Sequence, residues 1–252
     1  MNDFEAYYWR ISDLRSRDSA AGKALCESDD RGEIEAAFEQ LLRSDHVVAR
    51  GVALDQFSYA RTQDRYGAPD RFADLGRRAL EVARAELARP AVTSTTPRGG
   101  TVIGANHASA LGALRFLGDA SDLEAIAPLL FPTQDLNVVE EACMAASHCL
   151  EHADGETSHA IGAKLAQVFR DPNVLLEARI MAISPFRKYP ALEQDAALLE
   201  TLVHDALPMS AYAAWALVKR DPVNPEVRPI VATWPADAPY PAGEVRNRLN
   251  RG

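Results

Sequence analysis

Alanines recur along this chain at a nearly constant spacing, and this repeat limits the possible folds more than any other feature. Ala110, Ala142, Ala178 and Ala211 are separated by 32, 36 and 33 residues. Ala49 precedes Ala110 by 61 residues, close to twice that spacing. A period in the thirties is typical of solenoids built from pairs of helices. One pair cannot bury its apolar side alone, so neighbouring pairs must stack and share a core.

The pattern around each alanine predicts two short helices joined by a break. Apolar residues follow a helical period from about residue 30 onward. Three predicted helices begin with a capping signal, an N-cap side chain with an acidic residue three positions later: Asp30 with Glu33, Ser121 with Glu124, and Asn137 with Glu140. Breaks between paired helices fall at 44–45, 132–135, 171–173 and 207–208. The sequence therefore predicts an all-α fold.

Three segments depart from the repeat. Residues 1–29 are expected to form an N-terminal helical cap. Residues 90–106 are rich in proline, glycine and threonine, which predicts a loop inserted into the stack. Residues 221–252 carry six prolines, which permit only short helices. We expect this last segment to cap the final repeat, with Trp234 covering its core.

Two of the predicted second helices resemble the HEAT repeats. The segment 48–54, Val-Ala-Arg-Gly-Val-Ala-Leu, looks like the family's valine–arginine–alanine core, and the segment 177–183, Glu-Ala-Arg-Ile-Met-Ala-Ile, is similar. The other units have Leu111, Cys143 and Tyr212 in place of the arginine. The resemblance covers about residues 30–220. It implies a right-handed α-α superhelix, a solenoid of HEAT-like helical hairpins forming one domain over 1–252, and a habit of binding macromolecules.

Charge and composition exclude several classes of function. The formal net charge is −9, whereas a protein that grips duplex DNA usually carries a basic surface, so a nucleic-acid partner is not expected. The sequence contains no apolar run of the roughly 18 residues that a membrane helix needs. The three cysteines, Cys26, Cys143 and Cys149, are odd in number and lack metal-type spacing. We expect reduced thiols in a cytoplasmic protein.

The most informative feature for function is a block of acidic residues. Between Leu117 and Ala163 the chain has no lysine or arginine, but it has nine acidic residues. The helix predicted from Asn137 carries an apolar stripe, Val139, Ala142, Ala146, Cys149 and Leu150. Glu140, Glu141, Met144, Ser147, His148 and Glu151 fall on its other side. The residues expected to bind a partner are Glu140, Glu141, Met144, His148 and Glu151, together with Asp135. A negative surface of this kind would steer a basic protein toward the stack.

Catalytic and metal motifs are weak by comparison. The chain has no Gly-x-Ser-x-Gly elbow and no HExxH pattern. His148 and His152 lie four positions apart on one helix, with Cys149 or His159 nearby, but two histidines do not complete a metal site. We therefore predict no catalytic residue, no metal and no cofactor. Arg50 and Arg179 are expected to bond to inter-repeat loops and not to a substrate.

One enzyme alternative follows from the resemblance, because some alkylpurine DNA glycosylases consist of HEAT-like repeats. Such an activity would need a basic groove, aromatic rings and a carboxylate. Tyr212 and Trp215 could supply the rings, and the positive charge could come from Arg187, Lys188, Lys219 and Arg220.

The sequence thus favours a non-enzymatic protein-binding scaffold or inhibitor. Its partner is expected to be a basic protein, bound by the inner, acidic surface of the solenoid. An immunity-type protein that neutralises a basic toxin or nuclease is the specific form of this hypothesis.

Overall fold

The computed structural model describes residues 28–45, 49–51, 53–54, 73–95, 101–131 and 135–251, together with Ala21 and Ala24. These residues are mostly helical, as predicted. The helices are α3 (Arg31–Leu42), α5 (Ala73–Leu87), α6 (Ala105–Leu117), α7 (Leu123–Ile126), α8 (Leu136–Cys149), α9 (Gly155–Arg170), α10 (Leu176–Ile183), α11 (Asp195–His204), α12 (Met209–Arg220), α13 (Val227–Ala232) and α14 (Ala242–Leu249). Short 3₁₀ turns connect them: η2 (Ala120–Asp122), η3 (Ala127–Leu129), η4 (Leu150–His152), η5 (Ser184–Arg187) and η6 (Pro190–Leu192). The expected helical cap over 1–29 falls almost entirely outside the described residues.

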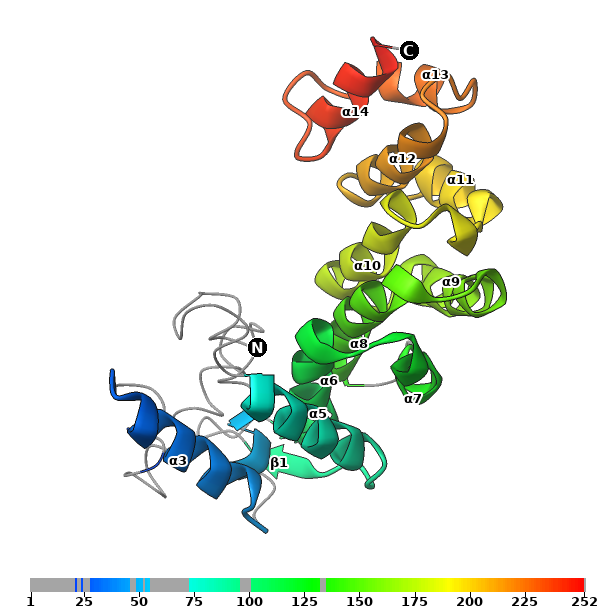
Figure 1. Ribbon diagram of the computed structural model, residues 1–252. Coiled ribbons are helices and arrows are strands. Elements are labelled where there is room, and N and C mark those ends of the chain that lie inside the picture. Colours follow the sequence, from blue (N-terminus) through cyan, green and yellow to red (C-terminus); the bar gives the residue numbers. More distant parts are fainter. Residues whose placement is uncertain are drawn as a thin grey trace.

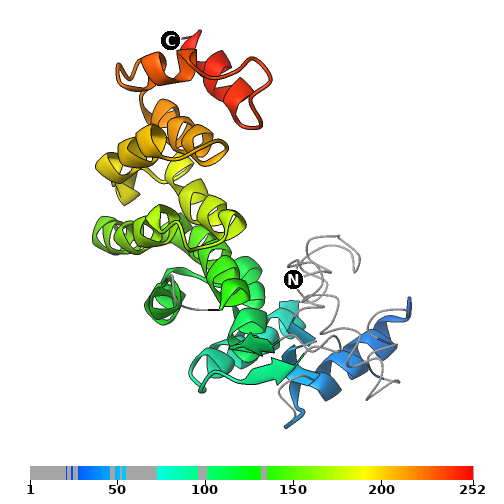
Figure 2. The same ribbon diagram turned by 180° about the vertical axis from the view of Figure 1, so that it is seen from behind.

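The helices form a long stack with two rows (Figure 1). Helices α6, α8, α10, α12 and α14 pack in succession and make the row that we call the B row. Helices α7, α9, α11 and α13 lie beside it and make the A row, as the view from behind also shows (Figure 2). The A row meets the B row through the pairs α9–α10 and α11–α12.

Helices α6, α8, α10 and α12 run in the same direction. At their starts, the Ile103 backbone N–H before α6 donates to Asp135 before α8 at 3.0 Å. Arg179 in the first turn of α10 bonds Asp205, which precedes α12, at 2.7 Å. At the other end, the Tyr189 hydroxyl beyond α10 donates to the Ser147 carbonyl near the end of α8 at 2.9 Å. The four helix starts therefore share one side of the stack, here called the leading edge.

The recurring alanines are core positions, as the repeat predicts. Ala110, Ala142, Ala178 and Ala211 all have 0% exposed surface. Each sits in a B-row helix that packs against the next one. A methyl side chain at this point lets the helix backbones approach closely, which explains why the position repeats.

The two arginines of the HEAT-like segments tie neighbouring units together, which confirms their predicted structural role. Arg50 donates to the Ser44 carbonyl at 2.7 Å and forms a buried ion pair with Glu86 of α5. Arg179 donates to the Phe169 carbonyl at 2.7 Å and pairs with Asp205 beyond α11. In both cases the guanidinium bonds a carbonyl that precedes it within about ten residues and an acid farther along the chain.

The insert at 90–106, which we expected to be a loop, contains a β-hairpin. Strands β1 (Thr93–Thr95) and β2 (Thr101–Ile103) pair antiparallel with Thr93 opposite Ile103. Threonine, valine and isoleucine favour strands, which accounts for this pairing. The buried Asn106 side chain anchors the insert, because it accepts from the Val92 N–H at 2.8 Å and donates to the Pro90 carbonyl at 3.2 Å.

Two predicted helix starts were wrong by two residues. The capping box before α7 is formed by Asp119 with Asp122 of η2, and not by Ser121 with Glu124. Helix α8 is capped by Asp135, whose side chain accepts from the Asn137 N–H, so Asn137 is not the N-cap. Asp30 does cap α3, as predicted, by accepting from the Glu33 N–H at 2.9 Å. The proline-rich region 221–252 contains the short helices α13 and α14, and Trp234 packs against the core.

Candidate functional site

Helix α8 presents the narrow polar face that the sequence predicts. The apolar stripe is buried, with Val139, Ala142, Ala146, Cys149 and Leu150 at 0–2% exposure. Val138, Cys143 and Ala145 are buried as well, because α8 lies between α6 and α10. The uncovered strip carries the half-buried residues Glu140, Glu141, Met144, Ser147 and His148. Four of the six predicted partner-binding residues therefore share one face of α8.

Asp135, which was also predicted to contact a partner, does not lie on this face. One of its carboxylate oxygens caps α8 and the other accepts the Ile103 N–H at 3.0 Å. It lies at the start of α8, whereas His148 is near the end, about 20 Å away at 1.5 Å per residue. Its role in the fold is to join the hairpin to α8 at the leading edge.

Glu151, the sixth predicted residue, lies just beyond the end of α8 beside residues that follow α10. The Lys188 amino group is 3.7 Å from the Glu151 carboxylate. The same amino group lies 4.9 Å from the centre of the Tyr189 ring, and a hydrogen bond with the Tyr189 side chain raises the pKa of Lys188. Since Tyr189 also bonds the Ser147 carbonyl, residues 188 and 189 cover the end of the α8 face.

The nine acidic residues of the sequence block do not gather into one patch. Arg84 of α5 pairs with Asp122 at 2.7 Å and with Asp119 at 3.1 Å, so a cation outside the block neutralises two of them. Hydrogen bonds from Ser121 hold the pKa of Asp119 below its usual value. Asp154 caps α9 by accepting from the Thr157 N–H at 2.7 Å. The negative charge on the α8 face is thus smaller than the sequence count.

The cysteines and histidines near α8 do not form a reactive centre. Burial raises the pKa of Cys143 well above its ordinary value and the pKa of Cys149 to about 12, so both thiols stay protonated. Within the part of the chain that the structure describes, no three His, Cys, Asp or Glu side chains are grouped so that they could hold a metal ion.

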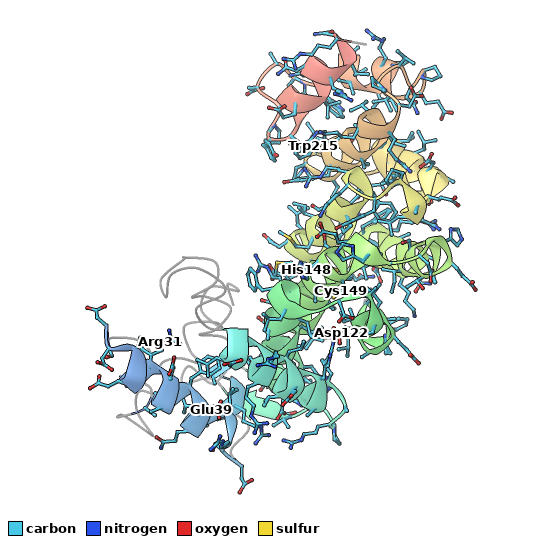
Figure 3. The ribbon with its side chains drawn as sticks, viewed as in Figure 1. Arg31, Glu39, Asp122, His148, Cys149 and Trp215 are labelled. Atoms are coloured by element: carbon cyan, nitrogen blue, oxygen red, sulfur yellow. The ribbon has the colours of Figure 1, made fainter. Side chains whose placement is uncertain are left out.

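A second group of residues forms an aromatic cluster on the B row, around Trp215 (Figure 3). The Trp215 ring lies 6.3 Å from Tyr212 on the same helix and 5.3 Å from Tyr240, which precedes α14. Tyr212 and Tyr240 are 6.2 Å apart and nearly perpendicular. The guanidinium of Arg187, at the end of η5, stacks on Trp215 at 3.9 Å. We call these four residues the aromatic–arginine cluster.

Part of this cluster was named from the sequence as possible glycosylase residues. The structure does bring together Tyr212, Trp215 and Arg187, and it adds Tyr240. It places the other predicted cations elsewhere, because Lys188 faces Glu151 and Arg220 pairs with Asp195. Tyr240 could not be found from the sequence, since it follows a proline-rich stretch that has no helical period.

Three consecutive residues connect the cluster to α8. Arg187 stacks on Trp215, Lys188 faces Glu151, and Tyr189 bonds Ser147. The α8 strip, residues 187–189 and the aromatic–arginine cluster therefore form one surface on the B row, which we call the B-row face. Trp215 and His148 lie on the same side of the stack (Figure 3).

No helix in the described part of the chain is both long enough and apolar enough to cross a membrane. Comparison with known proteins found no matching family model, no matching curated protein and no matching solved structure.

Proposed function

We propose that this protein is a non-enzymatic, HEAT-like α-solenoid that binds a protein partner through the B-row face. The observation that carries the proposal is the aromatic–arginine cluster, in which a guanidinium is stacked on a partly exposed Trp215. The two-row stack, its parallel B-row helices and the paired roles of Arg50 and Arg179 support the solenoid assignment.

The composition of the cluster suits a binding hot spot. Tryptophan, tyrosine and arginine are the residues whose truncation most often costs a protein complex 2 kcal/mol or more. Tyr240 is 61% exposed, so its ring is accessible to a partner. The mutual packing of the rings fixes their orientation before a partner arrives, which lowers the entropic cost of binding.

The charges on the B-row face match a basic partner with some acidic groups. Glu140, Glu141 and Glu151 lie along the α8 part of the face, and Arg187 and Lys188 lie between it and the cluster. The chain as a whole has a net charge of −9, so long-range attraction favours a basic protein. An inhibitor of a basic toxin or nuclease, acting in the cytoplasm, is the specific form of the proposal.

The test is affinity capture from the source cell, followed by titration of the purified partner against variants. We expect Trp215→Ala and Tyr240→Ala each to weaken binding about tenfold or more. Gln167→Ala, an exposed change on the A-row helix α9, is the control and should leave the affinity within twofold. A partner that binds both cluster variants as tightly as the wild type would overturn the proposal.

The glycosylase alternative is supported by the meeting of Tyr212, Trp215 and Arg187. However, within the described residues the cluster's ring and cation–π contacts join aromatic rings and a guanidinium, and no carboxylate takes part in them. A glycosylase needs a carboxylate next to the base that it releases. We expect no release of alkylated bases from DNA, and a release that Trp215→Ala abolishes would favour this enzyme over the binding protein.

A further inference from the structure

The exposed apolar side chains of this protein are concentrated on one side of the stack. Seven large hydrophobic residues of the described chain are exposed. Five of them are found where the chain leads into a B-row helix, with exposures between 39% and 57%: Ile103 before α6, Phe131 before α8, Leu175 and Leu176 at the start of α10, and Val203 near the end of α11. The other two, Val223 and Tyr240, lie after α12.

Four of these residues, Ile103, Leu175, Leu176 and Val203, belong to the leading edge. The bond between the Ile103 N–H and Asp135 joins the approaches to α6 and α8. The pair between Arg179 and Asp205 joins the approaches to α10 and α12. Because neighbouring helices pack about 8–10 Å apart, the side chains of successive approaches lie next to one another along this edge. Single exposed aliphatic residues are ordinary, but four on one edge make a row.

The leading edge is also negatively charged. Asp135, Asp171 and Glu177 lie among the apolar residues, and within the described part of the chain no ion pair involves them. The cations of this region are already engaged, since Arg170 pairs with Glu200 and Arg179 with Asp205. A ligand of the edge must therefore offer apolar side chains flanked by positive charge.

We propose that the leading edge binds a basic amphipathic helix of a partner protein. A second copy of this chain is disfavoured, because two molecules of charge −9 repel each other. A helix of about 18 residues is about 27 Å long, which matches the three spacings of about 8–10 Å between the approaches to α6, α8, α10 and α12. The inference rests on the proposed function, in that the partner is a basic protein, and it adds a second contact surface and the form of the segment that binds there.

The probe is a fluorescent 18-residue peptide of leucine and lysine with all leucines on one helical face, followed by anisotropy. A leucine–glutamate peptide of the same pattern tests the charge requirement. The edge variant is Leu175→Ser, Leu176→Ser and Val203→Ser combined. Serine is a good N-cap residue and Leu175 occupies the N-cap of α10 without a side-chain bond, so this helix should keep its start. Val223→Ser, at an equally exposed position beyond α12, is the matched control.

We expect the leucine–lysine peptide to bind the wild type at least tenfold more tightly than the edge variant. Val223→Ser should bind within twofold of the wild type, and Glu177→Lys should bind several-fold more weakly at low salt. Equal binding to the edge variant, or equal binding of the leucine–glutamate peptide, would overturn the inference. So would dimerisation of the wild type that the edge variant removes.

The variant Trp215→Ala separates this inference from the proposed function. It should keep the peptide affinity of the wild type, because Trp215 lies on the B-row face and not on the leading edge. If the edge variant binds the peptide normally while Trp215→Ala loses the natural partner, the leading-edge site fails and the proposed function stands. If Trp215→Ala keeps the natural partner, the proposed function fails whatever the peptide does.

Discussion

Replacing Arg179 with methionine should lower the free energy of unfolding by about 3 kcal/mol. The Arg179 side chain is 9% exposed and its partner Asp205 is 27% exposed. The charged hydrogen bond to the Phe169 carbonyl, at 2.7 Å, contributes about 2 kcal/mol because its loss leaves a buried acceptor unpaired. The ion pair adds about 1 kcal/mol, a value reduced because water still reaches Asp205. Methionine keeps most of the apolar stem and avoids a large cavity.

The assay is urea unfolding followed by circular dichroism, with Asp205→Asn and the double variant completing a thermodynamic cycle. Asp205→Asn alone should cost about 1 kcal/mol, and the double variant should cost less than the sum of the two single changes. If Arg179→Met lies within about 0.5 kcal/mol of the wild type, the guanidinium is not a tie between units. A coupling energy near zero would refute the ion-pair part of the reasoning alone.

Three further predictions concern packing, pH and thiol reactivity. Gly162→Ala should lower the unfolding free energy by about 1–3 kcal/mol in the same assay, because the new methyl group would overlap the Leu192 carbonyl oxygen; a stabilised variant would contradict this packing. Asp154→Ala should lower the melting temperature at pH 7. The hydrogen bond from the Thr157 N–H holds the pKa of the Asp154 carboxyl below its usual value in the folded protein. The stability that Asp154 contributes is therefore present above the pKa of the unfolded chain and is lost as the pH falls through the pKa of the folded protein. The melting temperatures of the wild type and Asp154→Ala should converge in acid. In a Cys26→Ser background at pH 8, Cys143 and Cys149 should react with a thiol reagent only after urea is added, and rapid native labelling would show that they are accessible.

The periodic features of the fold could be predicted from the sequence, because they depend on local patterns. The buried alanines and the Asp30 cap follow from residue type and spacing. The same is true of the short helices after residue 221, since proline acts on its own neighbours. Arg179 was predicted to be structural and to bond to an inter-repeat loop, and its ion pair with Asp205, beyond α11, agrees with this.

The features that could not be predicted depend on partners far along the chain. Asp135 and Asn137 are both good N-cap residues, and the hairpin N–H of Ile103 is what engages Asp135. In the same way Arg84 engages Asp119 and Asp122, which shifts the capping box from the predicted Ser121. The acidic block likewise looked like one patch because a count of charges along a sequence ignores cations supplied by another helix.

The contacts that stabilise the stack also position the B-row face, so stability and binding are linked in this protein. Arg179 fixes the start of α10 against the approach to α12, and Tyr189 fixes the residues beyond α10 against the end of α8. Residues of η5 pack against α10 and α12, and the Arg187 guanidinium at the end of η5 stacks on Trp215. The inter-unit bonds therefore help to preorganise the stacking of Arg187 on Trp215. A stack of repeated helical units can in this way change its binding surface by substituting a few residues on the B row, while the alanines and arginines that hold the units together stay the same.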